Sequence, residues 1–402
     1  MHPKFTNFSQ GIITRSILLV SLVSFFNDIG SEMLYPIMPV FLSSIGFSVV
    51  LIGLLEGFAE ATAGLSKGYF GNLSDKTGRR VPFVRFGYML SALSKPMMAA
   101  FAYVWWIFIA RTTDRLGKGI RTSARDALLS DETIPENKGR VFGFHRAFDT
   151  LGAAIGPILA LLYLHFYPGE YRLLFIIAFL PGLAAVFLTF FLHEKKKTPS
   201  EKVSLPGFFS FLAYRHKATR PYKLLLAGLL AFTLFNSSDA FLLLGLKNSG
   251  MSDTSMIGYY IFYNLVYALA AYPVGILADR LGLHRTLVAG FVVFSVVYLG
   301  MGFAAGMWQF GTLFLLYGIY ASATEGVSKA LITNISRKED TATALGLYNA
   351  LASIFTMLAS SMAGLIWYTM GPKAMFIFSG VGVLFTAGYM AWAGREAGRS
   401  SI

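Results

Sequence analysis

The sequence predicts an all-α integral membrane protein with twelve transmembrane helices arranged as two six-helix halves. Hydrophobic residues make up 55% of the 402 residues and charged residues only 14%, a composition that would give a soluble protein an apolar surface in water. Apolar segments of about 20 residues, the length at which a helix crosses a bilayer, recur along the chain. A motif repeated in the two halves supports the division.

Twelve apolar segments follow one another along the chain. Six lie at roughly 15–43, 48–73, 81–103, 104–130, 141–166 and 171–193, and six at roughly 223–247, 256–278, 286–305, 308–334, 341–367 and 372–394. The first begins after Arg15 and lacks a small-residue cleavage pattern, so we predict a helix there rather than a signal peptide. Charges interrupt the fourth, fifth and tenth segments most. The predicted domains are an N-terminal bundle (1–193), a linker loop (194–222) and a C-terminal bundle (223–402).

Basic residues gather on one side of the predicted membrane. They cluster at 76–80, in loop 194–222 and at the end of the chain, whereas the opposite loops hold little beyond Arg172, Lys247 and Lys373. By the positive-inside rule, both termini and loop 194–222 are cytoplasmic. The same rule accounts for the formal net charge of +13, so we expect no nucleic-acid partner. The expected partners are the lipid bilayer and a small-molecule substrate, and we expect a monomer.

Several kinds of chemistry lack the residues they need. The chain has no cysteine, which excludes disulfides, thiolate metal sites and cysteine nucleophiles. No phosphate-binding loop, zinc-ligand spacing or nucleophile elbow occurs in the sequence. We therefore expect no enzymatic activity, no bound metal and no cofactor, with protons as the coupling ion.

One motif occurs twice at equivalent positions. "GNLSDKTGRR" at 71–80 follows the second segment of the first half, and "GILADRLGLHR" at 275–285 follows the second segment of the second half, 204 residues later. Two glycines permit a tight turn between helices, and the aspartate between them can sit at the positive N-terminus of a neighbouring helix. A weaker match joins "FFND" at 25–28 to "LFNS" at 234–237. These repeats indicate duplicated six-helix halves.

The motif and the twelve segments resemble the major facilitator superfamily, transporters with two six-helix bundles around a central cavity. The family motif corresponds here to Gly71, Asp75, Lys76, Gly78, Arg79 and Arg80, and in the second half to Gly275, Asp279, Arg280, Gly282 and Arg285. The resemblance implies a gate latch, with Asp75 near Thr341 and Asp279 near Arg140 when the cytoplasmic side is shut. The alternative is that these are ordinary turn residues that only fix the topology.

Two other stretches resemble the superfamily less closely. "GAAIGP" at 152–157 resembles a small-residue element that permits close helix packing and a bend at its proline. "RTTDRLG" at 111–117 occupies the place of an R-x-x-Q-G-x-G pattern, but has Asp114 at the glutamine and Arg115 at the first glycine. The sequence that follows resembles a bacterial branch associated with iron chelates or other polar metabolites. That resemblance implies the bacterial cytoplasmic (inner) membrane.

Ionisable residues are concentrated in the predicted helices of the first half. A charge at the bilayer centre costs at least about 2.5–3.5 kcal/mol, so these side chains should face the protein interior and pair. We predict substrate binding or proton coupling for nine residues: Asp28, Glu32, Glu56, Glu60, Arg111, Asp114, Arg115, Lys118 and Asp239. The i, i+4 spacing places Asp28 with Glu32, Glu56 with Glu60, and Arg111 with Arg115 on one helical face each.

Paired carboxylates are suited to proton coupling. Two carboxylates this close cannot both ionise without cost in a poorly hydrated site, so one should hold a proton near neutral pH. Of the first pair, Asp28 is the residue that we predict to carry the coupling proton. The alternative is a structural salt-bridge network that fixes helix packing and never changes its state.

A second charged group lies toward the cytoplasmic side. It comprises Arg121, Arg125, Asp126, His145, Arg146 and Asp149, together with the i, i+4 pair Glu325 and Lys329. We interpret it as an inner structural network beside the gate. His145 could titrate near neutral pH, but one histidine among several charges is more often a hydrogen-bonded structural residue.

These observations favour a secondary active transporter that works by alternating access. The predicted cargo is a polar, anionic or zwitterionic organic solute, metal chelates included, and its movement is coupled to protons. A broad-specificity drug efflux proton antiporter is the alternative, although Arg111 and Arg115 would repel cations. A non-transporting membrane receptor or scaffold is a third possibility, although short loops leave little surface for partners.

Overall fold

Helices form every regular element of the structure. The computed structural model describes residues 12–35, 37–194 and 207–399. The N-terminal half contains α1 (Arg15–Glu32), α2 (Met38–Ser44), α3 (Val49–Thr77), α4 (Val81–Ala100), α5 (Val104–Asp131), α6 (Lys138–Phe166) and α7 (Tyr171–Thr189). The C-terminal half contains α9 (Arg220–Phe235), α10 (Ala240–Asn248), α11 (Asp253–Leu281), α12 (Leu283–Met301), α13 (Met307–Ile335), α14 (Thr341–Met370) and α15 (Pro372–Arg399).

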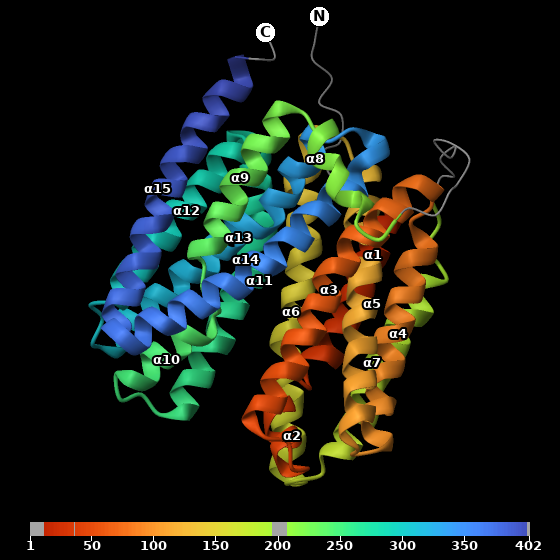
Figure 1. The fold of residues 1–402 in the computed structure, drawn as a ribbon, viewed down its shortest axis with the longest axis vertical. Helices are drawn as coiled ribbons and strands as arrows, with labels where there is room; N and C mark the ends of the chain where they lie inside the picture. The colour runs from red at the N-terminus through yellow and green to blue at the C-terminus, as the bar shows by residue number, and fades with distance from the viewer. Residues whose placement is uncertain (1–11, 36, 195–206, 400–402) are drawn as a thin grey trace, which may run out of the picture.

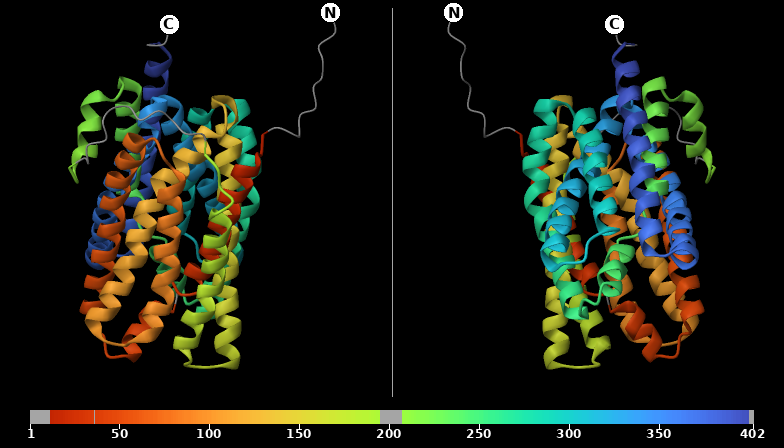
Figure 2. Two further views of the ribbon diagram at one scale, coloured as in Figure 1. Left: turned by 90° about the vertical axis from the view of Figure 1, so that its right-hand side faces the viewer. Right: turned by 90° about the vertical axis from the view of Figure 1, so that its left-hand side faces the viewer.

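The two halves form two helical bundles side by side (Figure 1). Short helices join or precede the long ones: η1 (Pro135–Asn137), η2 (Ser210–Ala213), α8 (Tyr214–Lys217) and η3 (Lys338–Asp340). The bundles meet at the end where α1 begins and α15 ends, and they separate toward the end that carries α2 and α10 (Figures 1 and 2). We call these the latch end and the far end.

The length and apolar character of the helices suit a membrane protein. By length and composition alone, seven of the described helical segments could cross a bilayer. Helices α1, α3, α4, α5 and α13 are not among these seven. Three of them, α1, α3 and α5, carry most of the acidic and basic side chains of the helices in the first half. Asp28, Glu32, Lys67 and six charged side chains of α5 line the cavity between the bundles, which keeps their charge away from lipid.

The first helix of each half is interrupted, which corrects two predicted spans. The span predicted at 15–43 is divided into α1 and α2, and the span predicted at 223–247 into α9 and α10. In the first case the sequence supplies Pro36, which has no backbone N–H to continue a helix. In the second case Asn236 ends α9 with an extended backbone (φ −89°, ψ 93°).

Tyrosines from α12 and α13 hold the break between α9 and α10. Asn236 Nδ2 donates to the Tyr320 hydroxyl at 3.2 Å, and Ser237 Oγ lies 3.0 Å from the Tyr298 hydroxyl. The Tyr317 hydroxyl donates to Asp239 Oδ1 at 2.6 Å. These side-chain bonds hold a non-helical stretch that lines the cavity between the halves, where irregular backbone is tolerated at membrane depth.

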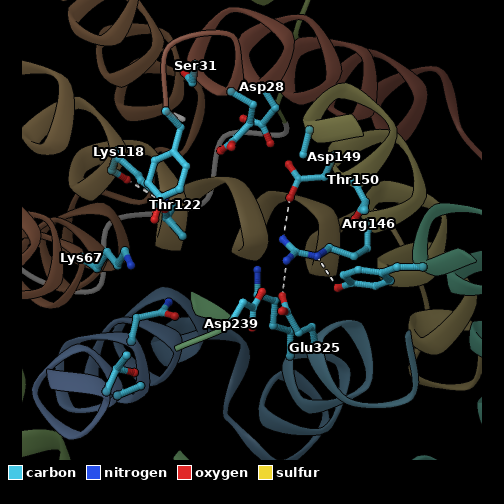
Figure 3. A pocket seen from close by; sticks show the side chains of 18 of the residues that line it. Asp28, Ser31, Lys67, Lys118, Thr122, Arg146, Asp149, Thr150, Asp239 and Glu325 are labelled. Atoms are coloured by element: carbon cyan, nitrogen blue, oxygen red, sulfur yellow. Dashed lines mark hydrogen bonds and ion pairs between the residues drawn. The ribbon is translucent and has the colours of Figure 1, made fainter. Parts of the chain in front are cut away.

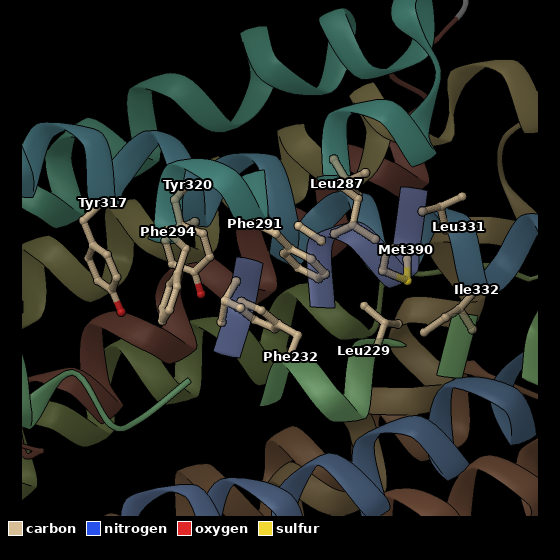
Figure 4. Close-up of a cluster of buried hydrophobic side chains, with 14 of the residues drawn as sticks. Leu229, Phe232, Leu287, Phe291, Phe294, Tyr317, Tyr320, Leu331, Ile332 and Met390 are labelled. Carbon is tan, nitrogen blue, oxygen red and sulfur yellow. The ribbon is translucent and has the colours of Figure 1, made fainter. Parts of the chain in front are cut away.

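Aromatic packing fills the core of the C-terminal half (Figure 4). Phe232 of α9 stacks on Phe291 of α12 with ring centroids 4.2 Å apart, and Phe294 stacks on Tyr298 at 4.0 Å. Phe232 and Phe291 also line the cavity described below. The core and the wall of the cavity are therefore one continuous aromatic layer.

Glycines bring the two bundles into backbone contact at the latch end. A Cβ atom at Gly71 of α3 would collide with the Ala342 carbonyl of α14, and one at Gly275 of α11 with the Gly139 carbonyl of α6. One turn or so deeper, a Cβ atom at Gly143 of α6 would collide with the Ala271 carbonyl of α11. The sequence element 152–157 serves another contact, because its glycines face the backbone of α1 within the N-terminal half.

A leucine at Gly143 should hold the latch end open. We expect Gly143→Leu to separate α6 from α11, because its side chain needs space that the Ala271 backbone occupies. The chain has no cysteine, so cysteines introduced at exposed Arg79 and Arg285 carry the only spin labels. Double electron–electron resonance should show a longer distance between the two labels in Gly143→Leu than in the protein with Gly143. Gly258→Leu, at an exposed position of α11 with open space, should leave the distance unchanged, and equal distances in both variants would contradict the packing argument.

Candidate substrate cavity

A cavity of about 510 Å³ lies between the two halves. Nine cationic and six acidic side chains line it. Figure 3 shows part of this lining. The cations are Lys67, Lys95, Arg111, Arg115, Lys118, Arg121, Arg125, Arg146 and Lys329, and the acids are Asp28, Glu32, Asp114, Asp149, Asp239 and Glu325. Seven of the nine residues predicted to bind substrate or protons are thus at the cavity, and the two others, Glu56 and Glu60, are not among its lining residues.

Helix α5 supplies most of the basic side chains because of their spacing. Its lining residues recur every three or four positions, at 111, 114, 115, 118, 121, 122 and 125. That period places them on one face of a helix. The charges that interrupt the fourth apolar segment therefore form a single polar stripe toward the cavity.

Glu56 and Glu60 pair with the arginines of α5 and not with each other. Arg111 donates to both carboxylate oxygens of Glu56, with Nε–Oε1 at 2.8 Å and Nη2–Oε2 at 2.9 Å. Arg115 Nη1 lies 3.2 Å from Glu60 Oε1. This bidentate geometry fixes the guanidinium of Arg111. The two glutamates are consequently counter-ions of cavity arginines, which corrects their predicted role as a carboxylate pair at the cavity.

The inner network and the cavity are one structure. Arg121, Arg125, Arg146, Asp149, Glu325 and Lys329 were predicted to form a separate inner network, but all six line the cavity. Asp126 and His145 lie behind it, with 0% and 2% of their surface exposed. Neither ring nitrogen of His145 has a hydrogen-bond partner among the described residues.

Two ion-pair systems connect the halves across the cavity floor. Arg146 of α6 binds Asp149 Oδ2 at 2.6 Å and also contacts Tyr267 of α11 and Glu325 of α13. Lys329 Nζ of α13 lies 2.9 Å from Asp126 Oδ2 of α5. Glu325 and Lys329 were predicted as an i, i+4 pair, and the structure corrects this: each pairs with the opposite half.

The acid that Asp28 faces is Asp149 rather than Glu32. Figure 3 shows the Asp28 side chain directed toward Asp149, with which it is in hydrogen-bonding range. Asn27 Nδ2 donates to Asp28 Oδ1 at 2.9 Å. Asp149 Oδ1 is buried and receives no hydrogen bond from an N–H or hydroxyl group in the described ranges. Two carboxyl oxygens attract each other only when one carries a proton, so this contact is suited to hold one.

Two cavity cations, Lys67 and Lys95, are absent from the predicted site residues. Lys95 is 1% exposed, and its Nζ donates to the Ser91 carbonyl at 3.0 Å. Lys67 lies on α3 eleven residues after Glu56 and seven after Glu60, a helical spacing that places the three on one side of the helix. That spacing is the signal in the sequence that could have identified Lys67.

The duplicated motif places each aspartate at the N-terminus of a helix in the opposite half. Asp75 accepts hydrogen bonds from Ala342 N at 3.3 Å, Thr343 N at 2.6 Å and the Thr343 hydroxyl at 2.7 Å. Asp279 accepts from Gly139 N at 2.7 Å and Arg140 N at 3.0 Å. Unpaired N–H groups and the helix dipole both favour a carboxylate at such positions.

The arginines of the motif do not all take part in these contacts. Arg80 is buried and pairs with Asp75, whereas Arg140 of α6 pairs with Asp279 at 2.9 Å. The glycines at 78 and 282 have positive φ angles of 64° and 100° and form the turns. Arg79, Arg280 and Arg285 are exposed, and Lys76 is half-buried. Within the described ranges none of these four forms an ion pair with Asp75 or Asp279, which corrects their predicted place in the latch.

Two helical bundles around a charged cavity are the architecture of a membrane transporter of the alternating-access class. The chain belongs to the Major Facilitator Superfamily, whose family model matches residues 20–263 and 247–401. The predicted family and the all-α membrane fold are thereby confirmed. Membership also makes the chain a multi-pass membrane transporter rather than the receptor or scaffold considered above.

Relatives support the same assignment. The chain is 32% identical over 375 residues to an uncharacterized MFS-type transporter of Methanocaldococcus jannaschii, with 92% of each chain covered. It is 25% identical over 340 residues, 81% of each chain, to a protein named multi-drug resistance efflux pump PmrA homolog of Lactococcus lactis. Its fold is similar to that of the human organic anion transporter TETRAN, with a TM-score of 0.75, 18% identity, and coverage of 95% of this chain and 100% of that chain.

Proposed function

We propose that this transporter couples protons to the movement of a polar, anionic or zwitterionic organic solute across the bacterial cytoplasmic membrane. Metal chelates are included among such solutes. The observation that carries the proposal is a cavity whose nine cations outnumber its six acids and which contains the Asp28–Asp149 contact. We further propose that the transporter is a monomer, has both termini in the cytoplasm and needs no cofactor.

The proposed coupling follows from the partners of Asp149. Arg146 and Arg125 both lie near this carboxylate, at 2.6 Å and 3.7 Å. A solute anion that draws one of these guanidinium groups away leaves Asp149 less compensated and so favours a proton shared with Asp28. Solute and proton then bind more tightly together than apart, which is the linkage that coupled transport needs. The rocking of two bundles can use it in either direction.

The proposed gate is the pair of aspartate contacts at the latch end. Asp75 accepts from the N-terminus of α14, and Asp279 accepts from the N-terminus of α6. These contacts hold the bundles together at the latch end, and the bundles diverge toward the far end. Release of both aspartates would let the bundles rock about the cavity. Four basic residues of the motif would instead contribute to the positive charge of the cytoplasmic face: Lys76, Arg79, Arg280 and Arg285.

A flux measurement tests the coupling. Purified protein in vesicles that contain a pH-sensitive dye is exposed to a library of polar metabolites. We expect some solutes to move protons, and Asp28→Asn to move the same solutes without protons, because an amide imitates the protonated carboxyl group but cannot release a proton. Glu170→Gln, an exposed position at the far end, is the control. Solute movement that ignores a pH gradient in the unmodified protein would contradict proton coupling.

A drug efflux antiporter is the second candidate function. The Lactococcus lactis relative named for multidrug efflux favours it at 25% identity. The excess of cations at the cavity disfavours an apolar cation as cargo, because arginine and lysine repel it. Expression in cells that lack their own pumps distinguishes the two: protection against cationic drugs supports this candidate and contradicts an anionic or zwitterionic cargo.

A further inference from the structure

We propose that the solute is a zwitterion that binds in one orientation, its anionic group at Lys67, Lys118 and Asn349 and its cationic group at Asp239. We call these the anion corner and the cation corner. The inference rests on the proposed function as a solute transporter and narrows its substrate class.

The anion corner contains hydrogen-bond donors without acceptors. Lys67 Nζ and Lys118 Nζ line the cavity, and neither forms an ion pair with a carboxylate in the described ranges. Asn349 Nδ2 is buried and has no hydrogen-bond partner there either. Unpaired ammonium groups and a bare amide donor are costly in a cavity at membrane depth. An anionic group from the solute would satisfy all three.

Packing brings the three helices that carry these donors together. The Lys67 carbonyl accepts from Ser123 Oγ of α5 at 3.0 Å, and a Cβ atom at Gly346 of α14 would lie 2.6 Å from the same oxygen. Asn349 is one helical turn further along α14, on the same face as Gly346. Figure 3 shows Lys67 and Lys118 on one side of the cavity, away from Arg146 and Glu325.

Nearby acids do not neutralise this corner. Glu60 acts electrostatically on both Lys67 and Lys118, and Glu32 acts on Lys118. Glu60 is engaged with Arg115 at 3.2 Å and is 52% exposed at its side chain. Glu32 lines the cavity without an ion pair within the described ranges. Glu60 and Glu32 together face three cations, Lys67, Lys118 and Arg115, so the corner retains an excess of positive charge.

The cation corner lies at the break between α9 and α10. Asp239 lines the cavity, and its carboxylate has one hydrogen-bond partner in the described part of the chain, the Tyr317 hydroxyl at 2.6 Å. Arg146, which also lines the cavity, is already bound to Glu325, Asp149 and Tyr267. Asp239 is therefore a carboxylate without a cationic partner among the described residues.

Tyrosine rings surround this carboxylate. The Tyr263 and Tyr317 ring centroids are 4.9 Å apart, and those of Tyr260 and Tyr263 are 6.1 Å apart. Tyr260 and Tyr263 line the cavity with Asp239. A carboxylate beside aromatic rings binds alkylammonium groups by charge and by cation–π attraction. The chemistry of this corner is therefore the complement of the anion corner.

The two corners belong mainly to different halves. Lys67 and Lys118 lie on α3 and α5 of the N-terminal half, and Asp239 lies in the C-terminal half. A zwitterion that spans them contacts both halves at once, whereas a simple anion or cation satisfies only one corner. Full binding energy thus depends on how the halves are placed, and this dependence is what allows a ligand to shift a conformational equilibrium.

Binding of matched probes tests the proposal. The probes are ω-amino carboxylates of increasing chain length, each with an N-acetylated and a carboxamide counterpart, titrated calorimetrically into the full-length protein in lipid nanodiscs. We expect the best amino carboxylate to bind about tenfold or more tightly than either counterpart, which equals roughly 1.4 kcal/mol. Asp239→Asn should remove the preference over the N-acetylated probe, and Lys67→Gln the preference over the carboxamide.

Matched variants separate charge from folding. Asp239→Glu and Lys67→Arg keep the charges and should retain the preferences, whereas Glu170→Gln and Lys373→Gln change exposed charges elsewhere and should alter nothing. Equal affinity for amino carboxylates and their counterparts, or no binding of any of them, overturns the zwitterion. Proton-coupled flux of anions that lack a cationic group also overturns it but leaves the proposed function intact. Absence of coupled flux for every solute contradicts the proposed function itself.

Discussion

Replacement of Arg146 by methionine is expected to abolish transport and to destabilise the protein by about 2–3 kcal/mol. Removing one partner of a buried ion pair leaves the other charge uncompensated, at a cost of roughly 3–5 kcal/mol when the site is dry. The cost here should be smaller, because the Glu325 side chain is 45% exposed, although Asp149 is only 8% exposed. Methionine keeps much of the length of the side chain and removes its charge.

The measurement is the midpoint of thermal unfolding together with solute flux in vesicles. Arg172→Met, which removes an exposed arginine at the far end, should change neither quantity. Adding Glu325→Gln to Arg146→Met should recover part of the stability, because one uncompensated carboxylate disappears. Unfolding unchanged by Arg146→Met would show that the guanidinium does not connect the two halves.

Removal of both latch carboxylates should shift the protein toward a state that is open at the latch end. Hydrogen bonds to a charged group contribute about 1.5–3 kcal/mol each, and Asp75→Asn with Asp279→Asn weakens those that join α3 to α14 and α11 to α6. A loss of about 1.4 kcal/mol at either side already changes the ratio of closed to open molecules tenfold.

Spin labels on cysteines at Arg79 and Arg285 report the result. We expect a second, longer distance in the double variant, with each single variant intermediate. Glu339→Gln removes an exposed acid of η3 beside the same contacts and should leave the distances of the unmodified protein. If the double variant gives the same distances as that control, the proposal that the two aspartates hold the latch end closed is contradicted.

Hydropathy and charge were enough to predict the helices and their order. The twelve apolar segments correspond to helices because a bilayer demands about 20 apolar residues in a row. The interruption of the span predicted at 223–247 could not be predicted, because the break after Phe235 depends on bonds to Tyr298, Tyr317 and Tyr320, which are more than 60 residues away. Periodicity within a segment has no information about such partners. In the span predicted at 15–43, Pro36 was a signal in the sequence for the break.

The candidate site was predictable in its residues and less so in its pairings. Helical spacing identified the polar stripe of α5, and the cost of intramembrane charge implied an interior position. The sequence did not predict that Glu56 pairs with Arg111. It also did not predict that Glu325 pairs with Arg146 and Lys329 with Asp126 in the opposite half. The pairings depend on how two bundles dock, which only tertiary structure specifies.

The two halves of the latch differ in where their arginine comes from, and this difference sets an order of events. Arg80 belongs to the same turn as Asp75, so that aspartate keeps its counter-ion when α14 leaves. Asp279 takes its arginine, Arg140, from the helix it must part from, so it loses helix and counter-ion together. The contact between α3 and α14 therefore separates at lower cost, and the rocking motion should begin there. The contact between α6 and α11 should separate last.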